Sequence, residues 1–104
     1  MHPRRYRVVL SSWAEGDRDA IYEHGLDDWG EAQADEYLRV LRQALEDLAT
    51  YPEMGRIRGE LGAGVRGIPV RRHVIYYMIE GEDVLVGRIL HARQDASAVS
   101  GIQR

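Results

Sequence analysis

The segment EAQADEYLRVLRQALEDLAT, residues 31–50, decides the fold of this chain of 104 residues. Its apolar side chains recur at intervals of three and four residues, the period of one face of an α-helix. The Tyr51-Pro52 pair then ends the pattern, because proline cannot continue a helix. The sequence therefore predicts a helix over 31–50 whose inner face carries Ala34, Tyr37, Leu38, Leu41, Leu45 and Leu48.

A second helix is expected immediately before this one, over residues 13–28. Ser12 followed three residues later by Glu15 is typical of a capping box at a helix start. The apolar stripe of this helix is weak, so its position depends on its neighbours. Gly30 leaves only a short gap between the two helices, which predicts an antiparallel helical hairpin.

One alternating segment precedes the helices and three apolar segments follow them. Residues 5–10 alternate with the period of a half-buried strand. After a glycine-rich connection, strands are expected over 65–70, 73–80 and 84–90. The last two form a hairpin, because a tight turn over 80–83 separates them. The segment 73–80 is apolar on both faces, which is typical of a central strand.

The element order βααβββ predicts an α+β domain, with the helical hairpin packed on one face of a small, largely antiparallel sheet. A chain of this length has room for one core, so residues 1–104 are expected to form a single domain. The chain has no cysteine, which excludes disulfides, thiolate nucleophiles and cysteine-based zinc sites. The four histidines lack the spacing of a metal-ligand set, and we place His73 and His91 near opposite ends of adjacent strands. We expect no metal and no cofactor.

Neither an export signal nor an apolar stretch of membrane-spanning length is found in the sequence, which predicts a soluble, cytoplasmic protein without a membrane partner. The segment GAGVRG, residues 62–67, matches the G-x-G-x-x-G pattern of dinucleotide-binding sites. That site needs a helix after the glycines, whereas a strand is expected here. We therefore interpret the glycines as a flexible turn.

Charge is unevenly distributed along the chain. The net charge is −3, and all 14 cationic side chains are Arg. Residues 1–55 hold six Arg against twelve acidic residues, a charge of −6, whereas residues 56–104 hold eight Arg against five, a charge of +3. The Arg of the second half form either a solvated face or a basic patch for acidic protein segments or phosphates. The negative net charge argues against direct nucleic-acid binding.

Two further groups of residues allow two interpretations each. Trp13, Tyr22 and Trp29 flank the first helix, where they either pack partly buried or anchor a partner protein. His91 lies between Arg88 and Arg93 in sequence. It either ends a strand with a local hydrogen bond or acts as a general acid beside phosphate-binding Arg, an arrangement suited to RNA cleavage.

Four segments, in order, resemble those of ParE-type toxins of the RelE/ParE superfamily, over about residues 6–95. DWGEAQADEY, residues 28–37, is similar to the family's W-G-x-x-Q-A-x-x-Y segment, and PEMGR, residues 52–56, to its P-x-x-G-R loop. VIYY, residues 74–77, fits the central strand, and RILHARQD, residues 88–95, the R-[IV]-L-H-x-R-x-D ending. The chain departs from the pattern at Arg18 and His24, where the family shows an apolar residue and an aromatic one, which affects how the hairpin packs.

The resemblance implies the toxin of a type II toxin–antitoxin system, neutralised in a hetero-oligomer by a small, DNA-binding, ParD-like antitoxin. ParE toxins inhibit DNA gyrase by direct binding, which implies an inhibitor without catalytic residues. RelE relatives instead cleave messenger RNA on the ribosome with Arg, Lys, Tyr or His side chains. The absence of Lys, and of any Tyr after Tyr77, argues against the better-known nuclease sets. A RelE-type endonuclease using His91 is the alternative, and an antitoxin-paired module with another target is a third.

This interpretation assigns the exposed candidates to two partners. The target-binding candidates come from the family's ending motif, with the tail to Arg104 beside them; they are Arg88, His91, Arg93 and Asp95. The antitoxin-binding candidates combine aromatic side chains beside the hairpin with Arg of the sheet; they are Trp13, Tyr22, Trp29, Arg66, Arg71 and Arg72.

Overall fold

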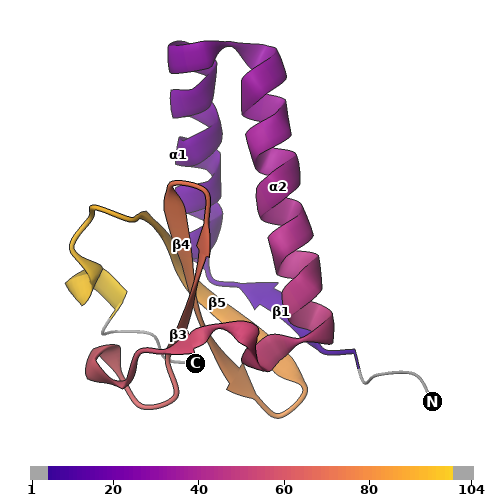
Figure 1. Ribbon diagram of the computed structural model, residues 1–104, viewed down its shortest axis with the longest axis vertical. Helices are drawn as coiled ribbons and strands as arrows, with labels where there is room; N and C mark the ends of the chain where they lie inside the picture. Colours follow the sequence, from indigo (N-terminus) through magenta and orange to yellow (C-terminus); the bar gives the residue numbers. More distant parts are fainter. Residues whose placement is uncertain (1–4, 100–104) are drawn as a thin grey trace.

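A helical hairpin stands on one face of a five-stranded sheet in the computed structural model, which describes residues 5–99 (Figure 1). The helices are α1 (Ser12–Trp29) and α2 (Glu31–Thr50). The strands are β1 (Arg7–Leu10), β2 (Arg56–Ile57), β3 (Arg66–Val70), β4 (His73–Glu80) and β5 (Asp83–His91). Three short 3-10 turns complete the described chain, η1 (Pro52–Met54), η2 (Gly59–Leu61) and η3 (Ala96–Val99).

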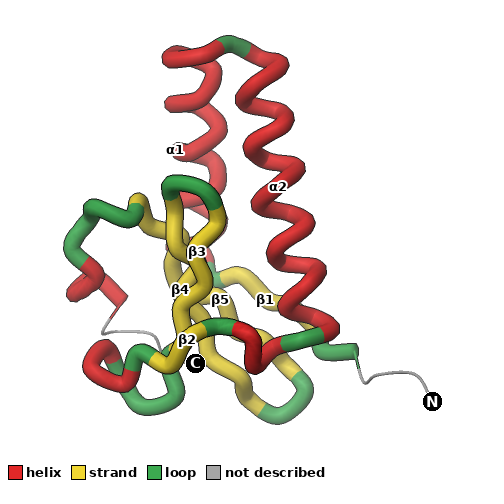
Figure 2. The backbone as a smooth tube through the Cα atoms, in the orientation of Figure 1, coloured by secondary structure: helices red, strands yellow, loops and turns green. Residues whose placement is uncertain are grey.

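The sheet has the strand order β1-β5-β4-β3-β2, as the tube in Figure 2 shows. β1 runs parallel to β5, and the other three pairs are antiparallel, which confirms the largely antiparallel sheet. β2 was not expected, since it is only two residues long and lies within the glycine-rich connection. Near the middle of β5, Gly87 forms a bulge: Val86 pairs with Tyr77, and Arg88 pairs with Tyr76.

The first helix is capped one residue earlier than the sequence suggests. The hydroxyl of Ser11, not of Ser12, accepts the hydrogen bond from the Ala14 amide, at 3.0 Å. The same hydroxyl donates to the carbonyl of Gly87 at 2.7 Å, so the cap also attaches α1 to the sheet at the bulge. The capping box at Ser12 was therefore wrong, because only the residue that directly follows β1 reaches both partners.

The two helices approach each other closely where small residues face one another. A Cβ added at Gly25 of α1 would lie 3.2 Å from the Cβ of Ala34 of α2. Besides Gly25, α1 buries only Ala14, which agrees with its weak apolar stripe. Gly30 joins the helices with a φ of 91°, a conformation that favours glycine.

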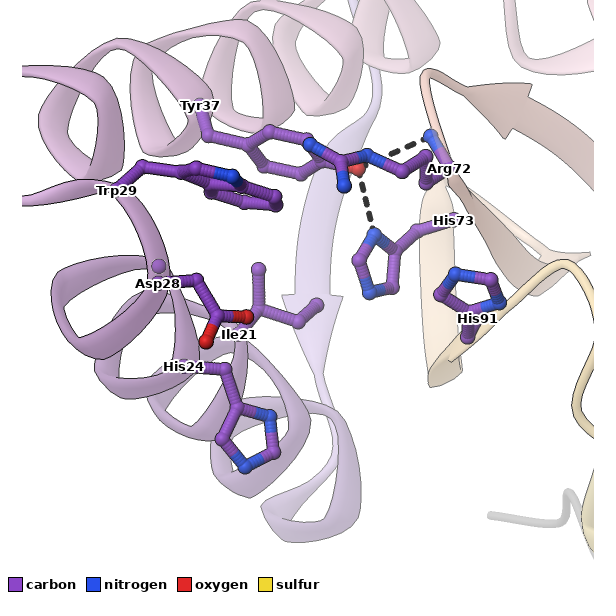
Figure 3. A pocket seen from close by; sticks show the side chains of 9 residues that line it. Ile21, His24, Asp28, Trp29, Tyr37, Arg72, His73 and His91 are labelled. Atoms are coloured by element: carbon purple, nitrogen blue, oxygen red, sulfur yellow. Dashed lines mark hydrogen bonds between the residues drawn. The ribbon is translucent and has the colours of Figure 1, made fainter.

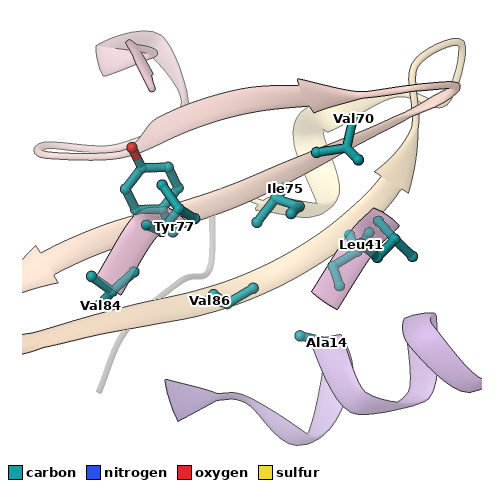
Figure 4. Close-up of a cluster of buried hydrophobic side chains, with 9 residues drawn as sticks. Ala14, Leu41, Val70, Ile75, Tyr77, Val84 and Val86 are labelled. Atoms are coloured by element: carbon teal, nitrogen blue, oxygen red, sulfur yellow. The ribbon is translucent and has the colours of Figure 1, made fainter. Parts of the chain in front are cut away.

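The main core lies between the hairpin and the sheet (Figure 4). Leu41 and Leu48 of α2 pack there against Ile75, Tyr77 and the neighbouring strands, with Tyr37 and Leu45 beside them. The predicted inner face of this helix is thus confirmed in part, because Ala34 instead faces Gly25 of α1 and Leu38 lines a separate pocket with residues of α1. A smaller cluster covers the opposite face of the sheet and contains Val65, Tyr76, Leu90 and Val99. Successive residues of β4 thus contribute to both clusters, as expected for a central strand.

The Tyr77 hydroxyl holds the loop after α2 against the sheet. It donates to the carbonyl of Pro52 at 2.6 Å and accepts from the amide of Gly55 at 2.9 Å, in a buried setting. Any side chain at Gly55 would collide with this hydroxyl. Burial also raises the pKa of Tyr77, so the hydroxyl keeps its proton as a donor.

Replacing Tyr77 by Phe is expected to lower the free energy of unfolding by about 1–3 kcal/mol, because both backbone partners would remain buried without a hydrogen bond. Urea unfolding followed by circular dichroism measures this loss. Tyr51→Phe is the matched control, since Tyr51 is 63% exposed, and it should change the stability by no more than about 0.5 kcal/mol. Equal stabilities of the two variants would contradict the role given to Tyr77.

Candidate functional site

A pocket of about 220 Å³ opens between the helical hairpin and one end of the sheet (Figure 3). Each layer contributes one wall. The helical wall is formed by Ile21, His24, Gly25, Asp28, Trp29 and Tyr37, and the sheet wall by Arg72, His73 and His91. The pocket is thus lined by ionisable, aromatic and apolar side chains together.

His73 and His91 lie directly opposite each other on β4 and β5. They are register partners, and their ring centroids are 5.4 Å apart in a T-shaped arrangement. The expectation that they lie near opposite ends of adjacent strands is confirmed, since His73 begins β4 and His91 ends β5, but antiparallel pairing brings these two ends together. The two imidazoles therefore form one pair at the mouth of the pocket.

A chain of hydrogen bonds fixes the ring of His73. The backbone amide of Arg72 donates to the Tyr37 hydroxyl at 3.0 Å, and the hydroxyl lies 2.6 Å from Nδ1 of His73. Burial, followed by the charges of His91 and Arg72, lowers the pKa of His73 to about 4. His73 is therefore neutral at pH 7, and Tyr37 lies at the centre of the site although its sequence pattern assigned it to the helix core.

Two antitoxin-binding candidates meet at the rim of the pocket. The guanidinium carbon of Arg72 lies 3.9 Å from the centre of the Trp29 ring, a cation–π contact. Arg71 precedes Arg72 in the two-residue turn between β3 and β4 and has a φ of 56°. Trp29 is 43% exposed, so the stacked pair presents an apolar face and a cationic group to the solvent.

The other antitoxin-binding candidates lie apart from this rim. Trp13 is 70% exposed, and its ring centre is 5.4 Å from the guanidinium carbon of Arg88. The Tyr22 hydroxyl donates to Asp35 at 2.7 Å. Arg66 donates to the carbonyls of Glu53 and Gly55, beside the loop that Tyr77 holds. The structure therefore does not gather the six candidates into one patch.

The four target-binding candidates differ in how exposed their functional groups are. Arg88 makes a two-pronged ion pair with Asp17 of α1, at 2.8 and 2.9 Å, and its side chain is only 18% exposed. This pair raises the pKa of Arg88. Asp95 accepts from the amide of Ser97, and that hydrogen bond lowers its pKa. His91 and Arg93 are exposed, whereas residues 100–104 of the tail, like His2, lie outside the described residues.

Within residues 5–99, no group of three potential ligands among His, Asp and Glu is arranged to hold a metal ion. Neither helix of this part of the chain is both long and apolar enough to span a membrane.

Known proteins resemble this chain in sequence and in fold. Residues 8–96 match the family described as ParE toxin of type II toxin-antitoxin system, parDE. Toxin ParE1 of Mycobacterium tuberculosis H37Rv is 36% identical over 90 residues, which are 86% of this chain and 92% of that protein. Toxin ParE1 of Caulobacter vibrioides is 36% identical over 92 residues, covering 88% and 95%.

Two solved structures share the fold. The chromosomal ParDE toxin–antitoxin system of P. aeruginosa superposes with a TM-score of 0.74 at 20% identity, covering 85% of this chain and 97% of that one. The RelBE2 toxin–antitoxin complex of Mycobacterium tuberculosis gives a TM-score of 0.60 at 22% identity, covering 84% and 98%. Both confirm the expected α+β architecture.

The depressed pKa of His73 makes the stability of the fold depend on pH. The unfolded chain binds a proton at this residue near pH 6.5 and the folded chain only near pH 4. The free energy of unfolding should therefore fall by about 1–3 kcal/mol as the pH is lowered from 6.5 to 4. Chemical unfolding at several pH values measures this fall, which should be smaller in His73→Gln. Identical pH profiles of the two proteins would contradict a neutral, half-buried His73.

Proposed function

The chain belongs to the family of ParE toxins of type II toxin–antitoxin systems, and on that basis we propose that it inhibits DNA gyrase by binding it directly and is neutralised by a ParD-like antitoxin. The observation that supports this proposal most is the exposed end of β5. There the segment 88–95, which resembles the ending of the family, presents His91 and Arg93 to the solvent.

The target-binding surface is centred on His91 and Arg93. Arg88 acts there indirectly, because its guanidinium is engaged by Asp17 and it thereby holds β5 against α1. Such a surface works by contact, and truncating one contact residue weakens binding in a single step. No bond of the target needs to be broken for inhibition of this kind.

The antitoxin-binding surface is centred on Trp29, Arg71 and Arg72. Stacking on Trp29 holds the Arg72 guanidinium in place, which favours a carboxylate partner because less side-chain freedom is lost on binding. The acidic and apolar side chains of a segment that folds onto the toxin would match the cationic group and the exposed indole.

A second candidate function is ribosome-dependent cleavage of messenger RNA, and the paired imidazoles favour it. His73 is neutral at pH 7 and His91 lies beside it, with Arg72 on the same wall of the pocket. A neutral imidazole can act as a general base, and a cationic guanidinium can hold a phosphate. Loss of one histidine should abolish activity if the protein is an endonuclease and only weaken it if the protein inhibits by contact.

Purified protein is expected to inhibit supercoiling by DNA gyrase and to leave ribosome-bound messenger RNA intact. His91→Ala should raise the concentration needed for half-inhibition by less than about tenfold, because it removes one contact among several. Arg42→Ala, at an exposed position on α2, is the control and should inhibit like the wild type. Codon-dependent cleavage that disappears in His91→Ala would instead establish the endonuclease.

Reversing the charge at Arg71 and Arg72 is expected to weaken the complex with the antitoxin. The Arg71→Glu/Arg72→Glu variant should bind at least tenfold less tightly in calorimetry, a loss of about 1.4 kcal/mol or more. Growth rescue by co-expressed antitoxin should fail in parallel. Arg42→Glu/Arg56→Glu makes the same change in net charge at exposed positions elsewhere and should bind normally. If both double variants bound alike, the electrostatic contact would be refuted.

A further inference from the structure

The hydrogen bonds of His91 determine which of its ring nitrogens carries a proton. The backbone amide of Arg93 donates to Nδ1 of His91 at 3.1 Å. An amide N–H can only donate, so Nδ1 must present a lone pair, and the proton of the ring is on Nε2. His91 therefore offers an N–H donor at Nε2.

The contact with Tyr37 favours the same tautomer for His73. The Tyr37 hydroxyl accepts from the Arg72 amide, and Nδ1 of His73, at 2.6 Å, is the one acceptor that its own proton has among the described contacts. A hydrogen bond in this direction places the lone pair on Nδ1. The neutral ring then carries its proton on Nε2. Tyr37 is thus the positioning residue for this imidazole, and the His73 ring lies between Tyr37 and the His91 ring (Figure 3).

This arrangement suits an anion rather than a metal ion. Metal ligation through Nε2 would need the proton on Nδ1, whereas Nδ1 of His91 accepts from the Arg93 amide and Nδ1 of His73 faces the Tyr37 hydroxyl. Arg72 adds a guanidinium that is stacked on Trp29 and has no ion-pair partner among the described residues. The sheet wall of the pocket is therefore a set of donors with a fixed cation and no acceptor of its own.

The opposite wall indicates what kind of anion fits. Ile21, Gly25 and Trp29 provide apolar surface, and Asp28 adds a negative charge. Both helices lie within residues 1–55, whose charge is −6, so a polyanion such as RNA would be repelled along its length. A single carboxylate on an otherwise uncharged segment meets Asp28 as the one acidic side chain that lines the pocket, since Asp17 is paired with Arg88, and it gains the Arg72 contact.

We propose that this pocket binds the carboxylate of an Asp or Glu side chain of the antitoxin, held by Arg72 and by Nε2–H of His73 and His91. The inference rests on the proposed antitoxin partnership. It adds to it a carboxylate-binding socket, formed by Arg72, His73 and His91. The antitoxin segment enters between the hairpin and the end of the sheet, with an apolar neighbour of the acidic residue packed on Trp29.

A double-mutant cycle between the full-length chain and its co-encoded antitoxin tests the socket. Arg72→Gln and His91→Phe should each lower the affinity about tenfold to hundredfold, while His91→Gln, which retains an N–H donor, should lose less. Each Asp and Glu of the antitoxin is changed in turn to the amide. At one antitoxin position, the change to the amide should lower the affinity for the wild-type chain but no longer for the Arg72→Gln variant. In the Arg42→Gln variant, every antitoxin change should have the same effect on affinity as in the wild type.

Three results would overturn the inference, and they can be told apart. Tight binding of wild-type antitoxin with no acidic position coupled to Arg72 would refute the socket and leave the partnership standing. No binding of wild-type antitoxin would refute the partnership itself. Binding of a short single-stranded RNA that is lost in Arg72→Gln and His91→Phe, with antitoxin affinity unchanged, would assign the pocket to phosphate.

Nuclear magnetic resonance of the imidazole nitrogens tests the tautomers independently. Both His73 and His91 should carry their proton on Nε2 in the free protein. Tyr37→Phe should lower the population of this tautomer at His73 and leave the tautomer of His91 unchanged. A purely structural role of Tyr37 would alter stability without changing the tautomer. Protonation of either ring at Nδ1 would overturn the donor arrangement.

Discussion

The bulge at Gly87 is the constraint on which the arrangement of the molecule depends. A regular register from the β4–β5 turn would pair residue 73 with residue 90, whereas the extra residue brings His91 opposite His73. The carbonyl of Gly87 also accepts from the N-cap Ser11, and two residues later the amide of Ile89 donates to Asp17. One irregularity in a strand thus fixes both the start of α1 and the pair of imidazoles at the pocket.

The sequence predicted the parts of the fold that repeat a simple period. Helix 31–50 has its expected bounds because six apolar residues mark one face and a proline follows the end. The cap of α1 was wrong by one residue, since Ser11 and Ser12 both suit the position and only contact with the sheet distinguishes them. β2 was missed because a strand of two residues is too short to show the alternation of apolar and polar side chains.

The candidate site was harder to predict, because its geometry depends on pairs that are distant in sequence. Asp17 and Arg88 are 71 residues apart, so the sequence pattern did not indicate that the guanidinium of this target-binding candidate is paired within the chain. Tyr37 followed the helix-core period, so nothing in the pattern indicated that its hydroxyl reaches His73. Residues 56–104 do carry a net positive charge, but two of their Arg are not free to form a basic patch. Arg66 donates to the backbone of the loop after α2, and Arg88 pairs with Asp17.

The shared pocket has a consequence for how such a protein diverges. Trp29 and Arg72 border the same cavity as His91, so any segment that covers the first two also shields the third. If both proposed partners bind there, they compete for one surface, and their concentrations relative to their dissociation constants decide which one is bound. On the functions proposed above, a substitution in the pocket would alter recognition of both partners at once. Trp13 does not line this pocket, so a substitution there leaves the pocket itself unchanged.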